Sequence, residues 1–230
     1  MVTAPGSVMV GERRPPSSYP LAVLEDALSR RTQYETAGID VGDVDPDPHV
    51  QFEEWFVAAA TDIVEANAMV LSTVGPHGPS SRTVLLREIH AGTFVFYTNR
   101  ESAKAVEMSI DPRVSLLFPW FPVHRQVRID GVAAPVPDAL SDSYFSSRPI
   151  ASRAAAIASP QSRPIPSREW LERRVGEVLE NEALERPETW GGYGVRPTRF
   201  EFWQGRQNRL HDRIRYEKSD AGWRIERLAP

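Results

Sequence analysis

The chain contains no cysteine among its 230 residues. Disulfide bonds, thiol nucleophiles, iron–sulfur clusters and thiolate zinc sites are therefore excluded. No apolar stretch approaches the roughly 20 residues that a membrane-spanning helix needs, and the N-terminal segment lacks the apolar core of a secretion signal. The formal net charge of −4 provides no basic surplus for binding nucleic acid. We expect a cytoplasmic protein that binds neither a membrane nor nucleic acid.

Signature motifs of several large enzyme classes are also missing. The sequence has neither a G-x-G-x-x-G segment after an expected strand nor a G-x-x-x-x-G-K-[ST] loop, which disfavours dinucleotide-binding and P-loop folds. It lacks the G-x-S-x-G elbow of many serine hydrolases. The five histidines do not show the spacing of metal ligands. We therefore expect no metal site and no hydrolytic triad.

Hydrophobic periodicity and turn residues predict both helical and extended segments. Helices are expected over Leu21–Tyr34, from Pro48 after an Asp47 cap, near Ser102–Ile110, over Asp138–Ser147 and over Ser167–Leu184. Strands are expected over Ala68–Val74, Ser81–Ile89, Thr93–Thr98, Arg113–Phe118, Arg125–Val132, Arg199–Trp203, Arg213–Glu217 and Trp223–Leu228. Short strands joined by tight turns favour an antiparallel sheet or barrel. We predict one α+β domain over residues 21–230, built on a β-barrel, behind a disordered tail over 1–20.

Basic residues embedded in strand-like or aromatic sequence are the most distinctive chemical feature. Arg82 and Arg87 flank an apolar segment, and Lys104 lies at an expected helix start. Arg148 follows Tyr144. An arginine is costly to bury unless it meets an anion, and its planar fork matches phosphate oxygens. From these residues alone, phosphate binding and simple pairing with carboxylates both stay open.

Short motifs follow one another in order from about Arg31 to the last residue. They include Arg82-Thr83-Val84-Leu85-Leu86, Phe96-Tyr97-Thr98-Asn99, Arg113-Val114-Ser115-Leu116-Leu117-Phe118-Pro119-Trp120, Arg125-Gln126-Val127, Ser147-Arg148-Pro149, Trp190-Gly191-Gly192-Tyr193, Glu201-Phe202-Trp203-Gln204-Gly205 and Asn208-Arg209-Leu210-His211-Asp212-Arg213. Each motif alone is a weak signal. In this order and at this spacing, the series resembles the pyridoxine/pyridoxamine 5′-phosphate oxidase family.

The resemblance implies an FMN-binding split β-barrel, mostly antiparallel with flanking helices. It also implies a homodimer with two flavin sites between the subunits. The implied activity is the FMN-dependent oxidation of pyridoxine 5′-phosphate or pyridoxamine 5′-phosphate to pyridoxal 5′-phosphate. Molecular oxygen would accept the electrons and leave as hydrogen peroxide, and the amine substrate would also release ammonia. The chain would thus be a pyridoxal 5′-phosphate synthase, an oxidoreductase of vitamin B6 metabolism.

The resemblance also implies which residues form the site. Those expected to bind the flavin are Arg82, Thr83, Val84, Leu85, Leu86, Arg87, Tyr97, Thr98, Lys104, Gln126, Gln161, Ser162, Trp203 and Arg213. Those expected to bind the substrate are Arg31, Tyr34, Arg87, Tyr144, Arg148, Ser152, Arg209 and His211. Of these, Arg209 and His211 would border the reacting carbon as the catalytic pair. On an extended segment, residues two apart point the same way.

The sequence departs from the family pattern at two positions. Arg87 stands where the family usually has lysine, which keeps the charge but changes its geometry. Ala103 stands where the family often has an arginine beside the flavin-phosphate lysine, and Arg100 is a candidate substitute. We expect weaker retention of FMN as a result.

Three alternatives stay open beside this function. A related flavin oxidase could act on another reduced ring, such as a phenazine precursor. A non-catalytic protein could bind flavin or pyridoxal phosphate without turnover. A barrel without flavin would have its arginines paired to carboxylates. The preference between the two B6 phosphates is also left open.

Overall fold

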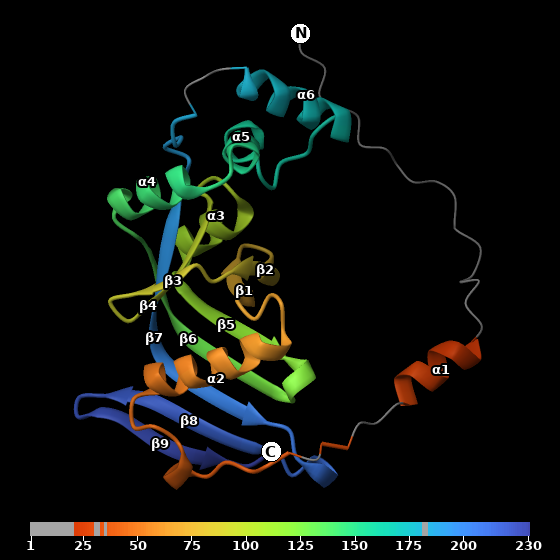
Figure 1. Ribbon diagram of the computed structural model, residues 1–230, viewed down its shortest axis with the longest axis vertical. Helices are drawn as coiled ribbons and strands as arrows, with labels where there is room; N and C mark the ends of the chain where they lie inside the picture. The colour runs from red at the N-terminus through yellow and green to blue at the C-terminus, as the bar shows by residue number, and fades with distance from the viewer. Residues whose placement is uncertain (1–20, 30–32, 35, 181–183) are drawn as a thin grey trace.

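The computed structural model describes residues 21–29, 33–34, 36–180 and 184–230 (Figure 1). The predicted tail over 1–20 and the predicted site residue Arg31 lie outside these ranges. In the described part of the chain, no helix is both long and apolar enough to cross a membrane.

One antiparallel sheet forms the centre of the molecule (Figure 1). Its strands are β1 (Ala68–Gly75), β2 (Gly78–Leu85), β3 (Glu88–His90), β4 (Thr93–Asn99), β5 (Arg113–Trp120), β6 (Arg125–Pro135), β7 (Trp190–Gln204), β8 (Asp212–Ser219) and β9 (Gly222–Leu228). The spatial order is β2-β1-β5-β6-β7-β4-β3, and β8 pairs with both β7 and β9. All of these pairings are antiparallel, as predicted.

The described helices lie on the sheet or near its ends, except the first of them, which Figure 1 shows apart from the sheet. They are α1 (Leu21–Ser29), α2 (Pro48–Asp62), α3 (Ala103–Ile110), α4 (Asp138–Ser147), α5 (Ile150–Ala158) and α6 (Arg168–Leu179), with short 3-10 turns η1 (Val41–Asp43), η2 (Phe121–Val123) and η3 (Gln207–Arg209). Figure 1 shows α4, α5 and α6 at one end of the long strand β7, and the β8–β9 hairpin at its other end. The two ends of β7 therefore lie in different surroundings.

Helix α2 begins where the sequence predicts it and closes the core. The Asp47 carboxylate accepts the N–H of His49 at 2.9 Å, and Pro48 takes the first helical position. Its apolar face buries Phe52 and Trp55. The Phe52 ring meets Phe94 edge-on at 4.9 Å, and such burial contributes about 1.5–3 kcal/mol per large apolar side chain. Most of the buried apolar residues form one hydrophobic cluster, while the assignment of a single domain over 21–230 stays a prediction.

Several predicted elements have different bounds, among them helix α6, which ends at Leu179 instead of Leu184. The described first helix covers Leu21–Ser29, and Tyr34 lies outside it, with its ring 4.7 Å from that of His124. The predicted strand over Ser81–Ile89 is two strands. The break falls where Leu86 donates its N–H to Asn67 and Arg87 donates its N–H to Val95, so the chain changes partners there.

For two other elements, the sequence patterns predicted either no element or too short a one. Helix α5 was not predicted, and β7 begins at Trp190 instead of Arg199. The early part of β7 is rich in glycine, which usually weakens a strand. Here the glycine allows close approach, because a Cβ on Gly192 would lie 2.6 Å from Val136 and 2.8 Å from Tyr97.

Candidate active site

A cavity of about 580 Å³ lies between the sheet and the helices at the Trp190 end of β7. We call it the cationic cavity. The sequence-predicted site residues that line it are Arg82, Thr83, Val84, Leu85, Arg87, Tyr97, Thr98, Lys104, Tyr144, Arg148, Ser152 and Gln161. Strands β2 and β4 and helices α3, α4 and α5 supply most of them. Residues from distant parts of the sequence thus converge on one site.

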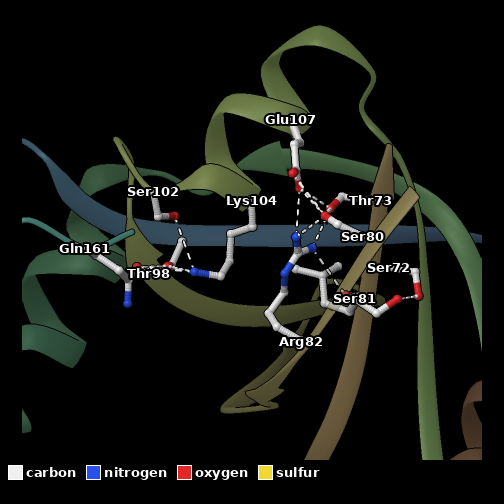
Figure 2. Close-up of polar contacts among 11 residues, drawn as sticks. Ser72, Thr73, Ser80, Ser81, Arg82, Thr98, Ser102, Lys104, Glu107 and Gln161 are labelled. Carbon is white, nitrogen blue, oxygen red and sulfur yellow. Dashed lines mark hydrogen bonds and ion pairs between the residues drawn. The ribbon is translucent and has the colours of Figure 1, made fainter. Parts of the chain in front are cut away.

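Lys104 carries a buried positive charge in the first turn of α3. Its side chain is 9% exposed, and its Nζ lies 3.1 Å from Thr98 Oγ1, 3.3 Å from Ser102 Oγ and 3.2 Å from Gln161 Oε1 (Figure 2). These three partners are neutral. Burial, together with the positive charge of Arg82, lowers the pKa of Lys104. A buried ammonium group without a carboxylate partner favours the binding of an anion.

Arg82 lies beside Lys104 but has a different set of partners. Its Nη2 forms an ion pair with Glu107 Oε2 at 2.8 Å, and Thr73 and Ser80 complete the cluster (Figure 2). Burial tends to raise the pKa of Glu107, but hydrogen bonds from Thr73, Ser80 and Arg82 outweigh it and lower the pKa. Glu107 therefore stays ionised, and the charge of Arg82 is largely compensated within the protein.

Arg148 supplies a second cation without a carboxylate partner. Its Nη1 is buried and has no hydrogen-bond partner among the described residues. The guanidinium lies 5.0 Å from the centre of the Trp190 ring, in the geometry of a cation–π contact. Burial lowers the pKa of Arg148. Arg87 lies on the same wall of the cavity, 5.8 Å from the centre of the Tyr144 ring.

Three nearly parallel rings support these arginines. Tyr97 stacks on Tyr144 at 4.1 Å and on Trp190 at 5.4 Å, with interplanar angles of 19° and 8°. The Tyr97 hydroxyl donates to Glu88 Oε1 at 2.7 Å. Burial and this carboxylate raise the pKa of Tyr97, so the phenol stays protonated. The rings form a rigid wall that fixes where the two guanidinium groups lie.

The alternative that every basic residue is paired to a carboxylate does not hold in this cavity. Elsewhere in the described chain such pairs are common, as between Arg113 and Asp111, Arg128 and Glu201, Arg186 and Asp142, Arg215 and Glu226, and Arg227 and Asp212. Within the described residues, no carboxylate forms an ion pair with Lys104, Arg87 or Arg148. Three cations without a carboxylate partner in the described part of the chain thus line one cavity.

A second group of predicted residues lies at the other end of β7. Its members, which we call the distal cluster, are Tyr34, Gln126, Trp203, Arg209, His211 and Arg213. Trp203 is the register partner of both Gln126 on β6 and Arg213 on β8, so the three side chains share one face. The His211 ring lies 4.7 Å from Trp203, and the Tyr34 ring lies 5.7 Å from His211.

The expected extended geometry of Arg209 and His211 is wrong. Arg209 ends the 3-10 turn η3, and both Asn208 and Arg209 have left-handed backbones with φ of 56° and 62°. His211 Nδ1 accepts the N–H of Arg206 at 3.1 Å, so the neutral ring carries its proton on Nε2. Burial and the nearby charge of Arg209 lower the pKa of His211, which favours the neutral ring.

Several other residues lie differently from the expectation or were missed. Leu86 and Ser162 adjoin lining residues without lining the cationic cavity themselves. Arg100 does not replace the arginine missing at position 103, because its Nη2 donates to Asp138 at 2.9 Å. Trp190 lines the cavity although no role was predicted for it. In the sequence, the position of Trp190 directly before Gly191-Gly192 was the one signal that could have pointed to this role.

One chain does not bring the cationic cavity and the distal cluster together. Thirteen residue steps of β7 separate Trp190 from Trp203, which at about 3.3 Å per residue is roughly 40 Å along the strand. Figure 1 shows the helices around the cavity at one end of β7 and the β8–β9 hairpin at the other. The predicted site residues are thus divided into two separate groups.

Comparison with known proteins gives consistent matches over nearly the whole chain. A family model described as pyridoxamine 5′-phosphate oxidase matches residues 57–182, and one described as the pyridoxine 5′-phosphate oxidase C-terminal dimerisation region matches 190–230. The pyridoxine/pyridoxamine 5′-phosphate oxidase of Nocardioides sp. is 50% identical over 210 residues, covering 89% of this chain and 98% of the relative. That of Rubrobacter xylanophilus is 48% identical over 216 residues, covering 92% and 100%.

Solved structures agree on the fold. PhzG from Burkholderia lata, in complex with tetrahydrophenazine-1-carboxylic acid, has a TM-score of 0.80 at 29% identity and covers 86% of this chain and 100% of its own. An FMN-binding protein related to pyridoxamine 5′-phosphate oxidase, from Nostoc punctiforme, has a TM-score of 0.66 at 18% identity, covering 80% and 98%. These likenesses confirm the predicted split-barrel fold. By its matched family models and its relatives, the chain belongs to the pyridoxamine 5′-phosphate oxidase family.

Proposed function

We propose that this protein oxidises pyridoxine 5′-phosphate or pyridoxamine 5′-phosphate to pyridoxal 5′-phosphate with bound FMN. Oxygen is reduced to hydrogen peroxide, and the amine substrate also consumes water and releases ammonia. Relatives 48–50% identical over about nine-tenths of the chain bear the name of this oxidase. The observation that carries the proposal is the set of cations without carboxylate partners, Lys104, Arg87 and Arg148, around one cavity. A cytoplasmic location stays a prediction.

The Lys104 end of the cavity fits the phosphate of FMN. Lys104 offers a buried charge, and the start of α3 adds backbone N–H groups and the positive end of the helix dipole. Thr98 and Gln161 already contact the Lys104 amine and can exchange these contacts for a ligand. When bound, FMN supplies a two-electron acceptor that oxygen can reoxidise. The protein contributes position and charge.

The opposite wall of the cavity fits the phosphate of the substrate. Arg148 and Arg87 provide two positive charges, and Tyr144 and Ser152 provide hydroxyl donors on neighbouring helices. The stacked rings hold both arginines before any ligand arrives, which reduces the entropy lost on binding. This arrangement favours a phosphorylated substrate over a ring that bears only a carboxylate.

Two copies of the chain complete the site in this proposal. The dimerisation region at 190–230 contains the distal-cluster residues Trp203, Arg209, His211 and Arg213. In the dimer, the distal cluster of one subunit would face the cationic cavity of the other. Arg209 and the Nε2–H of His211 would then border the substrate ring, orienting its reacting carbon toward the flavin.

The PhzG likeness supports one alternative, a flavin oxidase that acts on a reduced phenazine precursor. Arg148 and Arg87 together match a phosphate dianion better than the single carboxylate of such a substrate. An absorbance spectrum of the purified dimer, followed by anaerobic addition of pyridoxine 5′-phosphate, tests the main proposal. The flavin band should bleach and then return with peroxide when oxygen is admitted. Bleaching by a dihydrophenazine acid but by neither B6 phosphate would establish the alternative instead.

Affinity for FMN should decline as the pH rises through the pKa of Lys104. In the flavin-free protein this pKa lies below its ordinary value of 10.5. The phosphate dianion binds the ammonium form, so affinity is full below that pKa and is lost above it. Titrations of the flavin-free protein between about pH 7 and pH 10 measure the decline. Lys104→Arg should abolish it, since guanidinium stays charged, and a decline that persists would contradict the assignment. Riboflavin controls for titration of the flavin ring.

Arg209→Ala should lower turnover by roughly 100-fold and leave most of the flavin bound, because its charge orients the substrate and not the cofactor. Steady-state rates and the flavin content of the same preparation provide the measurement. Arg196→Ala, on an exposed part of β7, is the matched control. Unchanged activity in the Arg209 variant would remove this residue from the site.

A further inference from the structure

A carboxylate lies in the cluster that is expected to receive the flavin phosphate. Glu107, one turn along α3 from Lys104, forms an ion pair with Arg82 at 2.8 Å (Figure 2). The side chains of Arg82 and Glu107 are only 21% and 16% exposed. Screening by solvent is therefore limited, and the negative charge of Glu107 weakens the attraction between this end of the cavity and a bound anion.

The hydrogen bonds of the cluster close into a ring. Thr73 and Ser80 donate their hydroxyl hydrogens to Glu107, at 2.5 Å and 2.9 Å, and accept from Arg82. Arg82 Nη1 also donates to the Leu71 carbonyl at 3.3 Å. Both terminal nitrogens of Arg82 thus already have acceptors inside the protein. A phosphate can gain them only by displacing or sharing the internal partners.

The net positive charge at this end of the cavity is smaller than the negative charge of a dianion. Arg82 and Lys104 contribute two positive charges, and Glu107 removes one. Position 103, next to Lys104 on α3, holds alanine and adds no charge. Arg100 is engaged by Asp138 at 2.9 Å and contributes nothing here. The phosphate of FMN, with close to two negative charges at neutral pH, therefore meets a net charge of about one.

We propose that Glu107 competes with the flavin phosphate for Arg82 and thereby limits the affinity of this protein for FMN. The inference relies on the FMN site of the proposed function. Glu107 acts through Arg82 and is a positioning residue. Its carboxylate holds Arg82 in place in the flavin-free protein, so the incoming phosphate can gain this guanidinium only by displacing or sharing Glu107. The affinity for phosphorylated flavin is lower than the cavity would otherwise permit.

The test compares FMN with riboflavin, which lacks the phosphate, on the flavin-free dimer. Glu107→Gln keeps an oxygen that can accept from Thr73, Ser80 and Arg82 but removes the charge. Quenching of flavin fluorescence gives both dissociation constants. The Kd for FMN should fall about tenfold, equivalent to about 1.4 kcal/mol, while the Kd for riboflavin stays unchanged. Glu101→Gln is the matched control, since Glu101 is exposed and, among the described residues, forms an ion pair only with Arg163, at 2.9 Å.

A double-mutant cycle with Arg82→Met locates the effect. If Glu107 acts through Arg82, the Glu107→Gln gain should largely disappear in the Arg82→Met background. Ala103→Arg should tighten FMN binding in the wild-type background without disturbing the ring. Weaker binding of FMN by Glu107→Gln, or an equal change for riboflavin, would overturn the inference. Failure of the wild-type protein to bind either flavin would instead count against the proposed function.

Discussion

Replacing Arg148 with methionine should lower kcat/KM for pyridoxine 5′-phosphate by roughly 100- to 1000-fold. The substrate phosphate would lose a charge-assisted partner, and removing one member of a desolvated charge pair costs about 2–5 kcal/mol. Methionine keeps most of the volume and can still contact Trp190, 5.0 Å from the native guanidinium. The fold and the flavin content should therefore be preserved.

The control for this effect is an arginine that also contacts a tryptophan but lies outside the cavity. Arg174 is exposed, and its guanidinium lies 5.0 Å from the Trp170 ring. Arg174→Met should leave kcat/KM unchanged. The kcat/KM for pyridoxine, which lacks the phosphate that Arg148 would bind, should fall far less in the Arg148 variant than the kcat/KM for pyridoxine 5′-phosphate. An equal loss for both would show that Arg148 does not bind the phosphate.

Replacing Lys104 with methionine should raise the Kd for FMN by roughly 100-fold or more, since a buried charged group opposite a phosphate is worth about 2–5 kcal/mol. The same change should not destabilise the flavin-free protein. Lys104 is 9% exposed and its ammonium group has only neutral hydrogen-bond partners, and burying such a charge is unfavourable. The native lysine thus favours binding at the expense of stability.

Thermal unfolding of the flavin-free protein and titration with flavin together test whether Lys104 favours FMN binding but lowers stability. The melting temperature of Lys104→Met should equal or exceed that of the wild type, while FMN affinity falls. The chain has one other lysine, Lys218, which is exposed beside Trp223, so Lys218→Met is a natural control that should change neither quantity. A flavin-free variant that melts well below the wild type would mean that Lys104 supports the fold.

Sequence patterns predicted the fold correctly where residues adjacent in the sequence determine the local structure. The Asp47–Pro48 start of α2 depends on a cap and a proline that lie next to each other, and the structure contains it. Strand β7 was cut short because Gly191 and Gly192 weaken the local strand signal. These glycines are needed because residues far away in sequence approach them closely: Tyr97 lies opposite Gly192 on β4, and a Cβ on Gly191 would lie 2.5 Å from Arg100. Contacts of that kind leave no local pattern.

In the candidate site, too, local motifs were predictive and contacts between distant segments were not. The motifs that resemble the family predicted most of the residues that line the cavity. They did not predict that Glu107 pairs with Arg82, because this contact needs β1, β2 and α3 to be packed together. Nor did they predict the left-handed backbone at Asn208 and Arg209. Asparagine tolerates that conformation, but the sequence alone does not require it.

Because β7 separates the two groups of site residues, mutations in different subunits of the proposed dimer can affect the same site. In the proposed dimer, each site would combine the cationic cavity of one subunit with the distal cluster of the other. If one subunit is damaged at Lys104 and its partner at Arg209, both defects fall in the same site of the mixed dimer and the second site is whole. Two inactive alleles of this chain would therefore complement each other when co-expressed, which subunits with self-contained sites could not do.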